Sequence, residues 1–253
     1  MSRVDVFRIL FVLSGAIAQI AFGALPFIMG WEETVASRSN AAQTLITPAS
    51  YAFSIWSLIF AANFLFALYH AVRPGNALMR SVGWFAGAAF WFNSAWEIYA
   101  PLIGFDAGAL VIIALGWLSA LAFVLRAAAN RESGLAGRLV LFGLFLLGGW
   151  LNAAAFVHIA LTSEQLGWPV LGAGDLQAAL IILSAAVLAG AAVIVRTGSL
   201  SYAAALGWGL YAIHAANAGG EEALLIYAPL AGIAVLGLAV IAGWLRLPRS
   251  SAH

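Results

Sequence analysis

The chain has 253 residues, of which 64% are hydrophobic and only 8% are charged. A soluble domain averages about 25% charged residues, so this chain has too little polar surface to cover a core in water. The composition excludes a soluble enzyme, a nucleic-acid-binding protein and a disordered chain, and the net charge of +1 indicates no polyanionic partner. We therefore expect the lipid bilayer to be its solvent.

Apolar runs long enough to cross a bilayer, which takes about 20 residues in a helix, follow one another along the chain. The first run is longer than the apolar core of a signal peptide, so we expect a membrane span there. The sequence therefore predicts an all-α, polytopic transmembrane helix bundle of about eight spans, and it leaves open whether the short seventh one crosses completely. The spans are residues 6–29, 49–72, 82–102, 106–126, 139–161, 176–196, 200–218 and 223–245.

Charged residues separate onto the two sides of this arrangement. Ten of the eleven basic residues, all arginine, fall on one side, and Arg38 is the exception. Most acidic residues fall on the other side, which leaves only Asp5 and Glu132 with the arginines. The positive-inside rule then predicts that both termini are cytoplasmic. The ten arginines are Arg3, Arg8, Arg73, Arg80, Arg126, Arg131, Arg138, Arg196, Arg246 and Arg249.

The longest connections, about 30–48 and 162–175, lie on the outer side of the predicted bundle. The first contains Trp31 and Pro48, a composition consistent with an ordered cap over the helices. A flexible polar loop is the alternative interpretation.

The ten tryptophans sort by depth into two groups. Four lie near the predicted membrane surfaces, where tryptophan is enriched. The other six lie deeper and fit either ordinary helix packing or an aromatic-walled cavity for a flat apolar ligand. The deeper six are Trp56, Trp91, Trp96, Trp117, Trp150 and Trp208.

Polar residues gather in the outer half of the third, fifth and seventh spans. Because polar groups inside a membrane are costly, their convergence at one depth predicts a polar-lined cavity that opens outward. Other interpretations are water contact for Glu97 and His158, hydrogen bonding between helices for Asn93 and Asn152, and haem ligation by the histidines. Gln19 and Asn63 are expected to join helices, and His70 to lie at the inner surface. The outer-half group is Asn93, Glu97, Asn152, His158, His214 and Asn217.

Motifs for catalysis are missing from the sequence. Without lysine no Schiff base forms with retinal or pyridoxal phosphate, and without cysteine there are no disulfides, thiolate metal sites or thiol nucleophiles. HExxH, GxSxG and P-loop motifs are also lacking. We therefore predict that the protein is not an enzyme and has neither catalytic nor metal-binding residues.

Three motifs carry a family resemblance. Residues 47–60 read Thr-Pro-Ala-Ser-Tyr-Ala-Phe-Ser-Ile-Trp-Ser-Leu-Ile-Phe. A proline at the start of a span, followed by Phe53 and Trp56, resembles the second helix of the tryptophan-rich sensory protein/translocator protein (TspO/MBR) family. Asn93-Ser94-Ala95-Trp96 is similar to the Asn-x-x-Trp motif of that family, and Trp150-Leu151-Asn152-Ala153-Ala154 resembles its fifth helix. The resemblance covers residues 6–161.

The resemblance implies a five-helix TspO-like core at 1–161, followed at 162–253 by three additional transmembrane helices, as in a longer bacterial branch of the family. It therefore also implies a multi-pass protein of the bacterial inner membrane. It also implies a flat hydrophobic ligand, tetrapyrrole-like or sterol-like, with porphyrin or haem as examples, held beneath the cap at 31–48. The walls would be Tyr51, Phe53, Trp56, Asn93, Trp96 and Trp150, and with the outer-half group they form the predicted binding site.

We expect a sensor, carrier or regulator that binds its ligand by ring stacking. Two other functions stay open at this point. One is a facilitator for a small or lipophilic solute, and the other is a structural subunit of a larger membrane complex. The sequence leaves the ligand and the oligomeric state, a homodimer among them, undetermined.

Overall fold

The computed structural model describes residues 2–129, 135–168, 170–172 and 174–246, and their regular structure is helical throughout. Eight long helices match the eight predicted spans to within a few residues, which confirms the all-α class. They are α1 (Arg3–Met29), α3 (Ile55–Val72), α4 (Ala77–Leu102), α5 (Ala107–Ala129), α6 (Leu135–Leu166), α7 (Asp175–Thr197), α8 (Leu200–Asn217) and α9 (Ala223–Arg246). Short elements are α2 (Val35–Ala41) and the 3-10 turns η1 (Ser50–Ser54) and η2 (Val170–Gly172).

Six segments are long and apolar enough to cross a membrane: α1, the stretch Ser50–Val72, α5, residues Leu141–Leu166 of α6, α7 and α9. The less apolar α4 and α8 are not among these six. Arg131, Glu132 and Arg249, which belong to the predicted charge pattern, lie outside the described residues.

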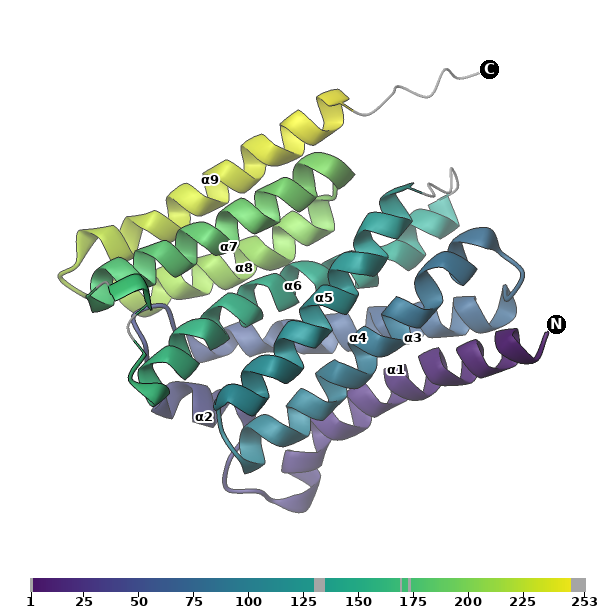
Figure 1. The fold of residues 1–253 in the computed structure, drawn as a ribbon, viewed down its shortest axis with the longest axis horizontal. Helices are drawn as coiled ribbons and strands as arrows, with labels where there is room; N and C mark the ends of the chain where they lie inside the picture. The colour runs from purple at the N-terminus through teal and green to yellow at the C-terminus, as the bar shows by residue number, and fades with distance from the viewer. Residues whose placement is uncertain (1, 130–134, 169, 173, 247–253) are drawn as a thin grey trace.

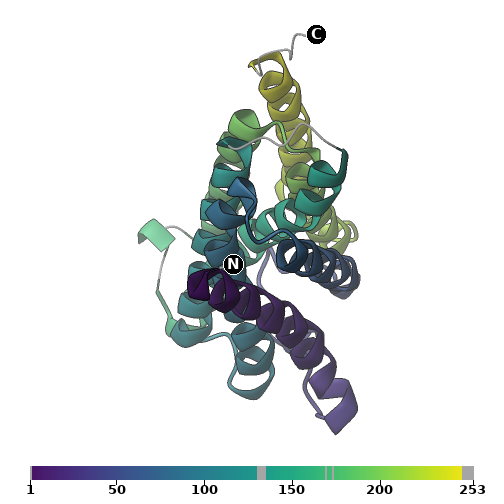
Figure 2. The same cartoon turned by 90° about the vertical axis from the view of Figure 1, so that its right-hand side faces the viewer.

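The long helices lie side by side along one direction (Figure 1). The start of α1 and the end of α9 are at the same end of the bundle, and α2 is at the opposite end. A view from the first of these ends shows α1 and α9 on opposite edges (Figure 2). The helices α7, α8 and α9 pack on one another, and they join the rest of the bundle mainly through α6.

Local sequence signals set several helix ends. Ser2 and Asp5 form a capping box at the start of α1, and Ser199 accepts a hydrogen bond from the Tyr202 backbone N–H at the start of α8. Gly198 closes α7 with φ of 65°, a left-handed conformation that glycine adopts without steric cost. Ser199 and Gly198 bound the short turn between α7 and α8, which lies at the end of the bundle where α1 starts (Figure 1).

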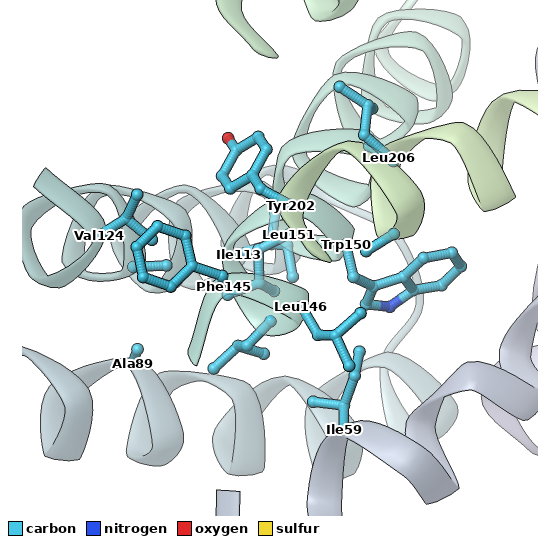
Figure 3. Close-up of a cluster of buried hydrophobic side chains, with 14 of the residues drawn as sticks. Ile59, Ala89, Ile113, Val124, Phe145, Leu146, Trp150, Leu151, Tyr202 and Leu206 are labelled. Carbon is cyan, nitrogen blue, oxygen red and sulfur yellow. The ribbon is translucent and has the colours of Figure 1, made fainter. Parts of the chain in front are cut away.

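Helix α6 is the centre of the fold because it is apolar around its whole circumference. It packs against α3, α5, α7 and α8. Figure 3 shows Leu146 and Trp150 of α6 among Ile59 of α3 and Leu206 of α8. Its neighbours bury 72% of its most apolar stretch, which leaves little of α6 for lipid.

The interface between α6 and α8 is especially close. A Cβ atom at Gly149 would overlap the backbone carbonyl of Tyr202, so only glycine fits there. Beside it, the Asn152 amide donates to the Ala186 carbonyl of α7 at 3.0 Å and accepts from the Tyr202 hydroxyl at 3.2 Å. One side chain of α6 therefore joins two of the last three helices.

The outside of the bundle carries large apolar side chains. They include Phe27, Leu65, Leu188 and Leu238, all well exposed. A water-soluble protein does not present so much contiguous apolar surface. This surface, together with the spanning helices, identifies an integral, multi-pass membrane protein.

Candidate ligand-binding site

The connection between α1 and α3 is an ordered cap over one end of the bundle. Helix α2 begins with a capping box between Thr34 and Ser37. The Arg38 guanidinium donates from Nε and Nη2 to the Pro101 carbonyl of α4, at 3.1 and 2.9 Å. Arg38, the exception in the predicted charge pattern, thus fastens the cap to α4.

Helix α8 holds the second part of this connection. The Ala49 N–H donates to the Ala212 carbonyl at 3.1 Å, and the Trp208 indole N–H donates to the Ala52 carbonyl at 3.0 Å. The Asn217 amide donates to the Leu45 carbonyl at 3.2 Å. These contacts confirm the ordered cap and exclude the flexible loop.

A cluster of aromatic rings lies beneath the cap. The ring centroid of Trp56 is 5.7 Å from that of Trp150 and 6.4 Å from that of Trp96. Phe53 meets Trp150 edge to face at 6.2 Å, and Trp96 stacks near Phe105 at 6.4 Å. The three helices α3, α4 and α6 therefore bring three of the six deep tryptophans together.

An inner cavity of about 40 Å³ lies against this cluster. Phe53, Trp96, Trp150 and His158 line it, with Ser39 and Pro48 of the capping segment above. Its volume has room for one or a few water molecules, whereas ligand pockets are typically about 300–1,000 Å³. A tetrapyrrole does not fit the inner cavity in this conformation, so its binding requires a lining side chain to move.

His158 in this cavity has a partner on each ring nitrogen. Its Nε2 accepts from the Trp96 indole N–H at 2.9 Å, which leaves the proton on Nδ1, 3.2 Å from the Ala154 carbonyl. His158 therefore offers no free nitrogen to a haem iron. In the described part of the chain, no group of three acidic or histidine side chains is placed to hold a metal ion.

A lateral groove of about 650 Å³ lies between α1 and α3. Ile20 and Phe27 of α1, both exposed, line it, so it opens on the lipid-facing surface. Its deeper wall is formed by Trp56 and by the buried Glu97 of α4. Phe53 lines both this groove and the inner cavity, and it forms the partition between them.

An outer vestibule of about 870 Å³ lies on the other side of Pro48. It is bounded by residues of the 40–49 loop, the end of α6, the start of α7 and the end of α8. Its lining is mixed polar and apolar and includes Glu164 and Asn217. Pro48 is the residue it shares with the inner cavity.

The comparison with protein families found a match that covers nearly the whole bundle. Residues 6–242 match the model of the family described as TSPO-like protein. The chain belongs to the TSPO-like protein family. The match runs through α7, α8 and most of α9, beyond the 6–161 over which the sequence motifs resemble the TspO/MBR family. No curated protein and no solved structure matches the chain.

The structure of this TSPO-like protein separates the predicted site residues into groups. Phe53, Trp96, Trp150 and His158 line the inner cavity. Phe53, Trp56 and Glu97 line the lateral groove, and Asn217 lines the outer vestibule. The other four line none of these three spaces: Tyr51, Asn93, Asn152 and His214.

Each of these four has a different setting. Tyr51 is partly exposed, and its ring meets Trp208 edge to face at 5.3 Å. His214 Nδ1 lies 2.8 Å from the Ile226 carbonyl of α9, and Asn152 joins α6 to α7 and α8. Asn93 is fully buried with neither amide atom paired.

Sequence reasoning overlooked the α1 side of the site. Gly23 of α1 and Phe60 of α3 line the lateral groove. The signal was spacing: Gly23 follows Gln19 by four residues and Phe60 follows Trp56 by four, so each pair shares a helix face. A second omission is at the opposite end of the bundle from the cap, where His70 is fully buried and accepts a hydrogen bond from Arg8 at 3.3 Å. His70 lies in the last turn of α3, near the end of its predicted span, but its side chain is enclosed by the helices.

Proposed function

We propose that this protein binds a flat hydrophobic ligand, tetrapyrrole-like or sterol-like, at the aromatic cluster beneath the cap. The observation that carries the proposal is the cluster of Trp56, Trp96 and Trp150, of which Trp96 and Trp150 line the inner cavity and Trp56 lines the adjoining lateral groove. The indole N–H groups of Trp56 and Trp150 have no hydrogen-bond partner among the described residues. Buried donors without partners cost free energy, and a ligand that carries acceptor atoms would pair with them.

Ligand binding would enlarge the inner cavity by displacing the ring of Phe53, which separates it from the lateral groove. Phe53 is half-buried and stands between the inner cavity and the lateral groove. When its ring turns aside, the two spaces join and reach the size of typical ligand pockets. The ligand would then lie between indole faces, where stacking adds about 0.5–1.5 kcal/mol per ring pair beyond the burial of apolar area.

We infer that the protein acts as a sensor, carrier or regulator and not as an enzyme. Family membership and the helix bundle support membrane binding of a hydrophobic molecule, and the sequence carries no nucleophile or metal-ligand motif. The anchored cap supports a regulatory role, because a ligand that displaces Phe53 of η1 also disturbs the cap-to-α8 hydrogen bonds next to it.

The test is a titration of the protein, purified in mild detergent, with protoporphyrin while tryptophan fluorescence is followed. We expect saturable quenching in the wild type. Removal of one ring, in Trp96→Leu or Trp150→Leu, should weaken binding about tenfold. Trp84→Leu is the matched control, since Trp84 packs against Phe7 and Phe11, away from the cavity, and should bind like the wild type.

Two results would contradict the proposal. One is quenching that rises linearly without saturation, and the other is unchanged affinity in folded Trp96→Leu and Trp150→Leu variants. Protein-dependent uptake of a solute into proteoliposomes would then favour the facilitator. Stoichiometric co-purification of other proteins would favour a subunit of a larger complex.

We also propose that α4 and α8 cross the bilayer, which gives eight spans with both termini cytoplasmic in a bacterial inner membrane. The alternation of helix directions and the separation of arginines from acids support this. The chain has no cysteine, so single cysteines report topology without background. Gly75→Cys and Leu200→Cys should react with an impermeant maleimide only from inside, and Ile103→Cys and Gly219→Cys only from outside. If both cysteines that flank α4, or both that flank α8, are labelled from the same side, that helix does not cross the bilayer.

A further inference from the structure

The lateral groove contains a buried acid that the proposed function does not use. Glu97 is only 5% exposed, and its Oε1 has no hydrogen-bond partner. The ion pairs present in the described residues both involve Asp5 and leave Glu97 without a basic neighbour. A carboxyl group in apolar surroundings is costly unless a cation or a donor lies beside it. Among the described residues, therefore, no basic side chain pairs with Glu97 and no donor bonds to its Oε1.

Aromatic rings stand next to the acid. Trp56 and Phe60 line the same groove and stack with ring centroids 5.2 Å apart and planes at 24°. The faces of aromatic rings attract ammonium groups, because their quadrupole is negative above the ring. A carboxyl group and two aromatic rings that line one groove are a set of groups suited to an organic cation.

Helix α1 leaves space beside the carboxyl group. A Cβ atom at Gly23 would lie 2.9 Å from Cε2 of Phe60 and 3.8 Å from Oε2 of Glu97. The missing side chain thus keeps the groove open down to the acid. Since exposed Ile20 and Phe27 line its mouth, a molecule would reach Glu97 from the lipid phase.

We propose that the lateral groove binds an amphiphile from the membrane whose ammonium group pairs with Glu97. The apolar body lies along α1, and the ammonium group sits against the rings of Trp56 and Phe60. The groove volume of about 650 Å³ is in the range of small-molecule sites. This site goes beyond the tetrapyrrole-like ligand of the inner cavity, and it does not require that ligand to bind.

The experiment compares two probes of equal chain length in phosphatidylcholine nanodiscs that contain the full chain. Stearylamine carries an ammonium group, and octadecanol carries a neutral hydroxyl group. Near saturation we expect stearylamine to raise the Tm by about 5 °C and octadecanol to leave it unchanged. Mass spectrometry of the re-purified protein should find one bound amine per chain.

Substitutions distinguish an ion pair between Glu97 and the ammonium group from a general effect of membrane charge. Glu97→Gln keeps the shape of the side chain and should abolish the shift with stearylamine, while octadecanol still leaves its Tm unchanged. Glu164→Gln removes an exposed carboxylate of the outer vestibule and should keep the shift. The proposal fails if Glu97→Gln retains the shift or if octadecanol produces an equal one.

A second variant tests the groove without touching the acid. Gly23→Ala pushes the Phe60 ring across the groove and should reduce the shift at least by half. Gly237→Ala in α9 is its control, because a Cβ atom there meets nothing within 4 Å, and it should behave like the wild type. An unchanged shift in Gly23→Ala would overturn the location. A shift with phosphatidylethanolamine as well would support the site and identify a lipid headgroup as the source of the ammonium group.

Discussion

The two parts of the bundle differ in how completely their polar groups are paired. In the last three helices the buried Tyr202 hydroxyl pairs with Asn152, and the partly buried Trp208 and His214 pair with the Ala52 and Ile226 carbonyls. In the described structure, every buried side-chain nitrogen or oxygen without a partner lies between Gln19 and Trp150. Unpaired polar groups lower stability. From this contrast we expect substitutions of polar groups in the last three helices to change stability most, and unpaired groups of the earlier helices to be the ones that a ligand would meet under the proposed function.

The largest effect is expected from a change that forces the two parts apart. The added methyl group of Gly149→Ala overlaps the Tyr202 carbonyl and comes within 3.1 Å of Ala205 Cβ. We expect a loss of about 3 kcal/mol in the free energy of unfolding, or roughly 6–12 °C in Tm. Thermal unfolding in mild detergent measures it. Gly207→Ala, whose nearest contact would be 4.0 Å away, is the control, and equal Tm values in the two variants would refute the close contact.

The second effect concerns the hydrogen bonds of Asn152. Asn152→Leu removes the bonds to α7 and α8 and leaves the Tyr202 hydroxyl unpaired, so we expect a loss of about 1–2 kcal/mol. Protoporphyrin affinity should stay unchanged, because Asn152 does not line the inner cavity. Adding Tyr202→Phe should restore part of the stability in a double-mutant cycle. A variant that lost affinity at unchanged Tm would instead place Asn152 in the binding site.

The third effect is local to the cap. Arg38→Gln loses the paired donation to the Pro101 carbonyl, which we expect to weaken the closed cap by about 1.4 kcal/mol. Amide hydrogen exchange in α2 should then become about tenfold faster, with little change in Tm. Arg3→Gln removes an exposed arginine and should leave that exchange unaltered. Equal exchange rates in both variants would show that Arg38 does not fasten the cap.

The smallest effect should have the opposite sign. Asn93 is fully buried, and neither atom of its amide group has a hydrogen-bond partner. An apolar side chain of similar size removes these two unpaired polar atoms from the core. We expect Asn93→Leu to raise stability by about 0.5–1 kcal/mol, visible as a rise of a few degrees in Tm. A fall like that expected for Asn152→Leu would contradict the contrast between the two parts of the bundle.

Helix positions were predictable because a single strong constraint fixes them. A chain in lipid must enclose its backbone hydrogen bonds in apolar helices, and charged or turn residues separate these. The predicted span 106–126 and the helix Ala107–Ala129 illustrate the agreement. Aromatic residues of the inner cavity could also be named, because Phe53, Trp96 and Trp150 stand in recognisable motifs.

The hydrogen-bond partners of the buried polar side chains could not be predicted, because they depend on how each helix is rotated about its axis. Asn93 and Asn152 are the same residue type at similar depth, yet one is unpaired and the other joins three helices. The contact between Arg8 and His70 links residues 62 positions apart. Packing between distant segments decides such contacts, and a single sequence carries no local signal for them. The sequence placed Glu97 in the binding region, but only packing shows that it faces the lateral groove.

The position of α8 has a consequence for any attempt to divide the protein. Gly209 and Ile213 form part of the inner-cavity wall, and Trp208, Asn217 and the Ala212 carbonyl hold the cap. A fragment truncated after α6 would therefore lose the α8 residues that line the inner cavity. It would also lose the three hydrogen bonds that hold the cap to α8. The five-helix portion is not a portable module in this chain, and its transplantation into another scaffold would need a substitute for α8.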